Sequence, residues 1–291
     1  MVINKHGSFY LRSGWGTKII QAVEADDMIF SPANEQEAVD RMGLGRVMIK
    51  ALRYWADASG LTTEEKVQGG IAERRTDLFD LLEANDRYFQ KPGSLLLLHR
   101  NIALNEENAT AWYWAFNEFD KQAFTKEEFV DGLHYFLAVS EMSIKKAAVD
   151  KEFNCFKNTY LADKKFDIKT VMDEDTYPFF GSLHLLRVNE DKKFEKTYLT
   201  KAEMPLQILI YAIAKDNPEE SGHRGQISID KIMEEKRQVG RYFPMRYSKL
   251  IDMLLEAENK KILTLNNNFG NRFIEFSDVQ YDKLLNEYYM E

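Results

Sequence analysis

The sequence predicts a mainly helical α+β protein with small β-hairpins, built from tandem units of winged-helix or helix-turn-helix type. Two observations lead to this fold class. Residues 36–61 have the periodicity of two helices joined by a tight glycine turn. Residues 205–276 contain three helical segments followed by two strands in which apolar and polar residues alternate. The same element order occurs once more in the middle of the chain. Because these units share element order and not sequence, they form a tandem array, not a true repeat.

The first unit centres on two helices that flank the turn at Gly43 and Gly45. Arg46, Lys50 and Arg53 are spaced at i, i+4 and i+7 and therefore share one face of the second helix. A helix-turn-helix that binds nucleic acid presents cations in this way, although charge stripes often only solvate a helix and such folds also dock proteins. The residues expected to pack against the first helix are Val47, Ala51, Leu52, Trp55 and Ala58.

The segment after Leu61 predicts a two-stranded wing and a helix. It begins with polar residues, contains the pair Gly69-Gly70, and recovers apolar spacing from Ile71 onward. A further helix is expected to begin at Pro92, since proline favours the first helical turn. Its run of leucines makes that helix apolar nearly all round, so we expect it to be buried.

The middle of the chain predicts three helices and a hairpin. The helices fall within residues 108–119, 124–139 and 143–161, and the two strands lie within residues 182–199. Thr125 and Glu128 have the spacing of a capping box, and Ser143 is the expected cap of the third helix. The clustered aromatic residues are interpreted as core, with a stacking surface as the alternative; they are Trp112, Tyr113, Trp114, Phe116 and Phe119.

The C-terminal segment gives the clearest winged-helix pattern. Three helical stretches within residues 205–216, 228–237 and 244–261 precede two alternating strands around the turn at Asn266 to Asn271. The predicted core of this unit is Leu206, Ile210, Ile213, Ile232, Leu250, Leu254 and Ile262.

These patterns predict three domains. We expect an N-terminal helix-turn-helix domain at 1–90, a helical middle domain with a hairpin at 91–202, and a winged-helix domain at 203–291. The linkers are expected near residues 85–94 and 200–205.

A second group of cations lies in the C-terminal domain, where residues 236–249 contain no Asp or Glu. The segment spans the end of one helix, a turn, and the start of the expected recognition helix, with Pro244 in the first turn of that helix. Cations and helix N–H groups bind phosphate at such a place. Tyr242 and Tyr247 are expected to add hydrogen bonds or stacking. The alternative is a solvated turn whose cations pair with nearby glutamates. The candidate DNA-binding residues are Lys236, Arg237, Arg241, Arg246 and Lys249, with Arg272 in the wing.

Composition limits how the chain could contact nucleic acid. The formal net charge of −8 argues against a protein that coats DNA through bulk charge, so any contact must come from a local basic patch. The lone Cys155 excludes a disulfide framework and fits a reducing compartment. No signal peptide or membrane-spanning run is recognised, and we expect a cytoplasmic protein without a membrane partner.

Catalytic patterns are scarce in this sequence. It lacks the phosphate-binding P-loop, and its five histidines show no metal-ligand spacing. His99 and His134 lie among apolar residues and are expected to be core histidines. The acidic run from Asp173 to Pro178 could bind a cation, but a solvated loop is the preferred interpretation. We therefore expect no catalytic residues, no metal and no cofactor.

Four segments carry a resemblance to a known family. They are SFYLRSGW at 8–15, MGLGRVMIKALRYWADASGL at 42–61, the stretch from LLLLHRN to AWYWAFNEF at 95–119, and SIKKAAVDKEFNCFKNTY at 143–160. The chain resembles, almost from end to end, a bacterial family known as domain of unknown function 4007. The family usually has a His-Glu-Thr-Phe-like stretch near its start, where this chain has His6-Gly7-Ser8-Phe9.

The resemblance implies which genes accompany this protein, but it implies no activity. Members of the family look like companions of phage-defence and DNA-modification genes, especially those for sulfate-reductase-like enzymes of the phosphorothioation type. Together with the basic helices, this favours a non-enzymatic, double-stranded-DNA-binding or regulatory subunit of such a system. One alternative is a scaffold that holds a modification enzyme through its winged helices, and the least favoured is a metal-dependent nuclease.

Overall fold

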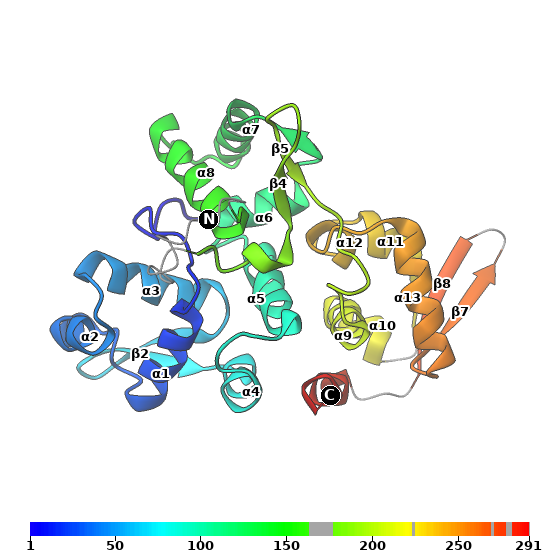
Figure 1. Cartoon of the computed structure of the whole chain (residues 1–291), viewed down its shortest axis with the longest axis horizontal. Helices are drawn as coiled ribbons and strands as arrows, with labels where there is room; N and C mark the ends of the chain where they lie inside the picture. The colour runs from blue at the N-terminus through cyan, green and yellow to red at the C-terminus, as the bar shows by residue number, and fades with distance from the viewer. Residues whose placement is uncertain (163–176, 223–224, 269–270, 278–280, 291) are drawn as a thin grey trace. The chain divides into compact units, whose positions relative to one another are not determined.

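The computed structural model describes residues 1–162, 177–222, 225–268, 271–277 and 281–290 (Figure 1). The chain divides into two compact units, Met1–Lys196 and Thr197–Glu291. The first unit contains the whole of the predicted N-terminal domain and most of the predicted middle domain. The finer division at residues 90 and 202 stays a prediction.

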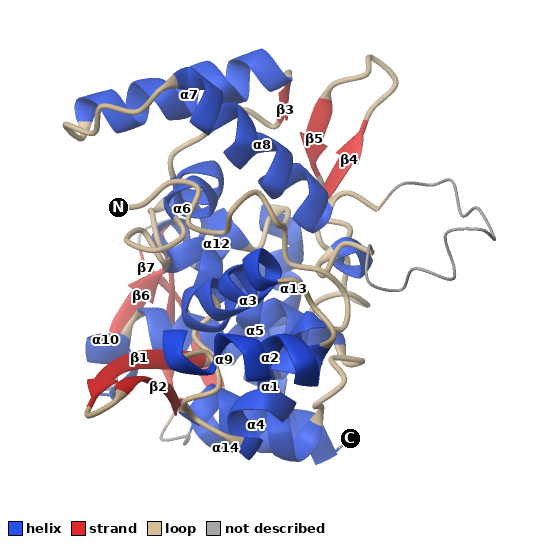
Figure 2. Ribbon diagram, turned by 90° about the vertical axis from the view of Figure 1, so that its left-hand side faces the viewer, coloured by secondary structure: helices blue, strands red, loops and turns tan. Residues whose placement is uncertain are grey.

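Helices dominate both units, and the strands form small antiparallel sheets (Figure 2). The fold is therefore α+β, as the sequence predicts. Within the described residues, no helix has the length and apolar character needed to span a bilayer. The helices of the first unit are α1 (Trp15–Ala25), η1 (Pro32–Asn34), α2 (Glu35–Met42), α3 (Arg46–Ala58), α4 (Asp77–Asn85), α5 (Pro92–Leu104), α6 (Thr110–Asn117), α7 (Lys126–Val139), α8 (Lys146–Tyr160) and η3 (Gly181–Leu183).

Helices α2 and α3 are joined by the predicted glycine turn. Gly43 ends α2 with φ of 65°, a left-handed conformation that glycine adopts without a steric penalty. The buried stripe of α3 includes Ala51, Leu52 and Trp55, as expected. Val47 is an exception and is 56% exposed, because it lies in the first turn, where the stripe extends beyond the core.

The predicted wing follows α3 as a two-stranded hairpin. Strands β1 (Thr62–Val67) and β2 (Gly70–Arg75) pair antiparallel, with Val67 opposite Gly70 at the turn. Helix α4 then begins at Thr76, whose hydroxyl accepts a hydrogen bond from the N–H of Phe79 at 3.2 Å. The predicted hairpin and the helix after it are confirmed.

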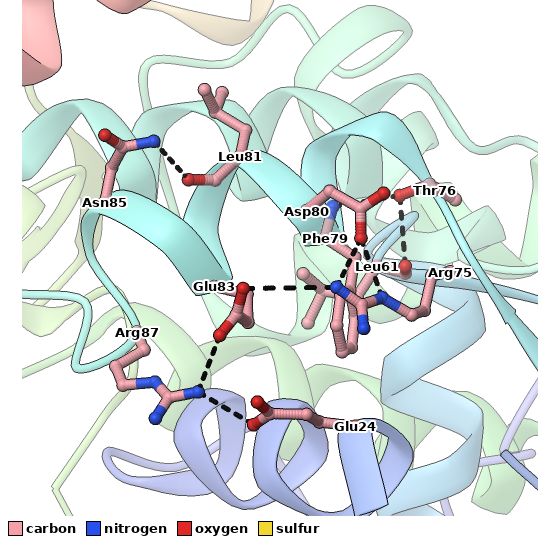
Figure 3. A network of polar contacts seen from close by, with 10 residues as sticks. All are labelled: Glu24, Leu61, Arg75, Thr76, Phe79, Asp80, Leu81, Glu83, Asn85 and Arg87. Carbon is pink, nitrogen blue, oxygen red and sulfur yellow. Dashed lines mark hydrogen bonds and ion pairs between the residues drawn. The ribbon is translucent and has the colours of Figure 1, made fainter.

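Ion pairs attach α4 to its neighbours (Figure 3). Arg75 at the end of β2 pairs with Asp80 at 2.6 Å. Arg87 pairs with Glu83 at 2.8 Å and with Glu24 of α1 at 2.7 Å. The cations of this region are thus neutralised by carboxylates from adjacent elements.

The remaining helices of the first unit enclose an aromatic core. Helix α5 is buried along most of its length, and the five aromatic residues predicted as core in and after α6 are all buried. The capping box of Thr125 and Glu128 is present at the start of α7. Helix α8 is preceded by Lys145, so the prediction of Ser143 as its cap is wrong: the helix begins later than its sequence suggests. Cys155 is buried, as expected.

The predicted hairpin of the middle segment belongs to a three-stranded sheet. Strands β4 (Leu186–Val188) and β5 (Phe194–Lys196) pair antiparallel, and β5 also pairs with the short β3 (Ala123–Phe124). Lys196 is buried there and donates to the carbonyl oxygens of Ala115 and Phe119, at 2.5 Å each.

The second unit consists of helices around another three-stranded sheet. Its sheet has the order β6-β8-β7, and all its neighbouring strands are antiparallel. Its elements are α9 (Leu206–Asp216), α10 (Pro218–Gly222), β6 (Gln226–Ser228), α11 (Ile229–Glu234), α12 (Val239–Tyr242), α13 (Tyr247–Asn259), β7 (Leu263–Asn268), β8 (Asn271–Phe276) and α14 (Tyr281–Met290).

The core of the second unit is the one that the sequence predicts. All seven residues named for it are buried, and Leu250 and Leu254 are fully enclosed on one face of α13. The short elements β6 and α12 were not predicted, because each is too short to show a periodicity. Proline 244 precedes α13 and does not lie in its first turn, since the helix begins at Tyr247.

Candidate nucleic-acid interface

The three predicted cations of the first unit lie along α3, but carboxylates of neighbouring elements accompany them. Arg46 and Lys50 are exposed, and both approach Glu35 at the start of α2. The Nζ of Lys50 lies 3.1 Å from this carboxylate and the Nε of Arg46 lies 3.9 Å from it. One glutamate thus offsets part of the charge of two cations.

Arg53 is more buried than Arg46 and Lys50. Its side chain is 21% exposed, and its Nε lies 2.7 Å from Glu64 of β1 and 3.5 Å from Glu73 of β2. The Glu73 side chain is fully buried and accepts a hydrogen bond from the hydroxyl of Thr62 at 2.6 Å. Burial raises the pKa of Glu73 to about 7, because the charged carboxylate loses its hydration there. Arg53 is therefore tied to the hairpin.

A cavity of about 730 Å³ opens beside this group. It is bounded by η1, α3 and β1, and the N-terminal segment and the loop before α6 complete its wall. Cations and carboxylates alternate in its lining, so it has no single sign of charge. The charged residues of the lining are Lys5, Glu35, Lys50, Arg53, Asp57 and Glu64.

The acid-free segment of the second unit is arranged differently. Arg246 is the N-cap of α13 and is exposed, and Lys249 follows in the first turn. Lys249 is half-buried, and its N–H donates to the carbonyl oxygen of Arg246 at 2.9 Å, so the two residues lie together at the helix start. Within the described residues, neither forms an ion pair with a carboxylate.

The backbone at this helix start adds to the positive potential. No side chain caps α13, and its first turn contains no acidic residue. Among the described residues, no side chain accepts from the N–H groups of Tyr247 and Ser248. Free N–H groups and the positive end of the helix dipole favour anions at this place.

The other candidate cations of the unit precede or follow this helix start in the sequence. Lys236 and Arg237 are exposed in the turn after α11, and Arg241 is half-buried in α12. Arg272 is exposed on β8, opposite Asn267 of β7, and makes no ion pair within the described part of the chain.

The two tyrosines of the acid-free segment have different positions. Tyr242 is fully buried and its hydroxyl donates to Asp216, so the predicted role in phosphate contact or stacking is wrong for this residue. The short helix α12 directs it into the core. Tyr247 is 40% exposed, and its ring is accessible.

Sequence reasoning missed Tyr198, which belongs to the same surface. Its ring is 47% exposed, and the guanidinium of Arg246 lies over it at 5.8 Å from the ring centre. The N–H of Leu199 donates to the carbonyl of Pro244 at 2.8 Å and so fixes this strand-like segment beside the start of α13. No periodicity or motif marks Tyr198.

The described histidines belong to the first unit and differ in burial. His134, which was expected in the core, is only half-buried, and its Nε2 lies 3.0 Å from the carbonyl oxygen of Ile144. His99 is buried and lies 2.8 Å from the hydroxyl of Tyr160, which confirms it as a core residue. His6 is buried against Glu152 at 2.9 Å. Across the described ranges, no group of three or more His, Cys, Asp or Glu side chains gathers where it could hold a metal ion. Residues 173–176 of the acidic run lie outside the described residues.

Comparison with known proteins identifies a family and a shared fold. A family model described as "Protein of unknown function (DUF4007)" matches residues 3–289. No curated protein matches the chain. Among solved structures, the crystal structure of SspB is similar, with a TM-score of 0.83 at 24% identity, over 99% of this chain and 88% of that chain.

A structure of magnesium ion-bound SspB is also similar. Its TM-score is 0.81 at 23% identity, again over 99% of this chain and 88% of that chain. At this level of identity, both similarities show the fold alone.

Proposed function

We propose that this chain, which belongs to the DUF4007 family of proteins of unknown function, binds DNA through the start of α13 in its C-terminal unit. The observation that carries this proposal is the pair Arg246 and Lys249. They lie at the start of a helix, in a segment without acids, and have no carboxylate partners among the described residues. The chain would act as a non-enzymatic recognition or regulatory subunit of a cytoplasmic DNA-modification or phage-defence system.

The order of elements in the second unit supports a winged-helix interpretation. The elements α9, β6, α11, α13 and β7–β8 occur in this order, with the short helices α10 and α12 between them. In helix-turn-helix proteins the second helix of the motif enters the major groove with its N-terminal residues toward the bases. Here α13 would take that role, and Arg272 on the hairpin would reach the neighbouring backbone.

We expect the first unit to contribute less to DNA binding than the second unit. Helices α2 and α3 with the hairpin β1–β2 also have a helix-turn-helix order, and Arg46, Lys50 and Arg53 are its candidate contacts. Each of these cations has a carboxylate within 4.0 Å. A phosphate would have to compete with that carboxylate, so we assign the main contact to α13.

The negative net charge of the chain limits the affinity that we expect for DNA. A net charge of −8 opposes the approach of a polyanion, so affinity should depend on few phosphate contacts and should be modest. We expect a dissociation constant on the order of micromolar at low salt. A partner protein, such as the sulfate-reductase-like enzyme suggested by the family resemblance, would then supply tighter binding.

Fluorescence anisotropy with a labelled duplex at two salt concentrations tests the proposal. Arg246→Glu and Lys249→Glu should each weaken binding to all sequences and reduce the salt slope by about one phosphate contact. Lys50→Glu is the matched control, since it reverses an exposed helix cation that already has a carboxylate partner. Its effect should be smaller than that of either reversal in the first turn of α13.

The scaffold alternative gives a different result in the same experiment. If the wild type binds no duplex at low salt, or if both reversals at α13 leave binding unchanged, DNA contact through this surface is rejected. Docking of a modification enzyme on the same helices would then be the better account of these cations.

A second candidate function is metal-dependent cleavage of DNA; one of the solved structures of the same fold is of magnesium ion-bound SspB. Within the described residues no group of carboxylates and histidines fits a metal ion. Asp173 and Asp175, outside those residues, remain the sequence candidates. Incubation of supercoiled plasmid with Mg²⁺ or EDTA tests this: the proposal above expects no cleavage, and cleavage that is lost in the double Asp→Ala variant would overturn it.

A further inference from the structure

Two exposed tyrosines are next to Arg246, one in the chain and one beneath its guanidinium. Tyr247 follows it in the first turn of α13, and Tyr198 lies beneath it from the segment that precedes α9. The hydrogen bond from Leu199 to Pro244 holds the two segments side by side within the second unit. The surface formed by Tyr198, Arg246 and Tyr247 is called the tyrosine–arginine surface below.

The exposure of these two residues contrasts with that of other tyrosines in the second unit. Tyr242, Tyr288 and Tyr289 are buried. By contrast, Tyr198 and Tyr247 are 47% and 40% exposed. Neither hydroxyl forms a hydrogen bond within the described residues, and the Tyr198 ring has the Arg246 guanidinium over it.

Exposed aromatic rings beside a cation match the chemistry of unpaired nucleotides. A base that is free of its duplex can stack on a tyrosine ring, and a guanidinium can bind the phosphate between two such bases. In a paired duplex the base faces are covered by their neighbours, so phosphate contacts alone would not use these rings.

We propose that the tyrosine–arginine surface binds unpaired DNA nucleotides, so that the preferred ligand is single-stranded DNA or a duplex with an unpaired segment. This inference rests on the proposed function, because Arg246 and Lys249 supply its phosphate contacts. Tyr198 and Tyr247 add stacking, which works on any base and gives little sequence preference.

The experiment compares three labelled ligands of equal length by fluorescence anisotropy: a single strand, a duplex, and a single strand whose central nucleotides are abasic. The wild type should bind the single strand more tightly than the duplex, and the abasic strand should lose that advantage. Tyr198→Leu and Tyr247→Leu should each weaken single-strand binding by about 5-fold or more and weaken duplex binding by a smaller factor.

Two further variants separate stacking from structure. The phenylalanine variants of both positions keep the ring and should keep the single-strand preference. Tyr135→Leu removes a ring that is 72% exposed on α7 and should change no affinity. Melting temperatures of all variants verify folding.

The outcomes distinguish this inference from the proposed function. If the wild type binds duplex and single strand equally, or if the leucine variants weaken both to the same extent, the stacking role is overturned while DNA binding stands. If the wild type binds none of the three ligands at low salt, the proposed function itself is overturned.

Discussion

Helices α3 and α13 have the same local setting and different surroundings. Each follows a helical segment and a turn, each precedes an antiparallel hairpin, and each carries cations on one face. Around α3, carboxylates from α2 and from the hairpin approach every predicted cation. At the start of α13, Arg246 and Lys249 have none among the described residues.

The two hairpins explain much of this difference. Strands β1 and β2 supply Glu64 and Glu73 to Arg53. Near its turn, the hairpin β7–β8 carries asparagines and Arg272 instead. A row of cations on a helix therefore becomes a free basic surface only if the elements that pack beside it bring no acids.

The largest expected effect concerns the opposite, buried face of α13. Leu254 is fully enclosed, so Leu254→Ala should lower the free energy of unfolding by about 2–5 kcal/mol through lost burial and a residual cavity. Urea unfolding followed by circular dichroism measures this. Arg246→Ala is the control on the exposed face and should change stability by less than about 0.5 kcal/mol. Similar costs for both variants would mean that α13 has no separate binding face.

The next effect concerns the ion pairs between Arg53 of α3 and the carboxylates of the hairpin β1–β2. Glu73 has a pKa of about 7 in the fold against an ordinary value of 4.5, so the folded protein holds this proton more tightly than the unfolded chain. The associated stability is complete below about pH 4.5 and is lost as the pH rises to about 7. The loss amounts to as much as about 3 kcal/mol.

Glu73→Gln tests this by removing the titrating group while keeping an oxygen that can accept from Thr62. The variant should not show the loss of stability between pH 4.5 and pH 7 that Glu73 causes, and above pH 7 it should be more stable than the wild type. Urea unfolding at pH 5 and pH 8 measures the difference. Glu65→Gln, in an exposed position of β1, should keep the wild-type pH profile. An unchanged profile in Glu73→Gln would show that Arg53 fully compensates the buried charge.

Local signals in the sequence predicted much of the fold. The glycine turn between α2 and α3, the Gly69-Gly70 hairpin and the capping box at Thr125 each depend on neighbours in the chain, so periodicity and turn chemistry were sufficient. The short β3 and β6 were missed because strands of two or three residues show no alternation and form only through their partners.

The candidate site was predictable to a smaller degree. The cations themselves were evident, since an acid-free segment can be recognised from composition. Their partners were not, because Glu64 and Glu73 reach Arg53 only after the hairpin folds back on α3. The burial of Tyr242 and the exposure of Tyr198 likewise depend on how α12 and the segment before α9 pack, which no local pattern reveals.

The smallest expected effect concerns the carboxylates beside α3. It tests whether they alone make α3 a weaker DNA contact than α13. Glu35→Gln removes the carboxylate that Arg46 and Lys50 share, so both cations become available to phosphate. If pairing is what weakens α3 as a DNA contact, duplex affinity at low salt should rise by about 2- to 5-fold, and the salt slope should become steeper.

Glu37→Gln is the matched control for this variant. It removes the same charge from the same helix, but Glu37 pairs with Arg41 and not with the cations of α3. A general reduction of repulsion would raise affinity equally in both variants, whereas release of Arg46 and Lys50 would raise it further in Glu35→Gln. Anisotropy titrations at two salt concentrations separate these results. Equal gains would mean that α3 takes no part in DNA binding, and the contact would then be confined to the C-terminal unit.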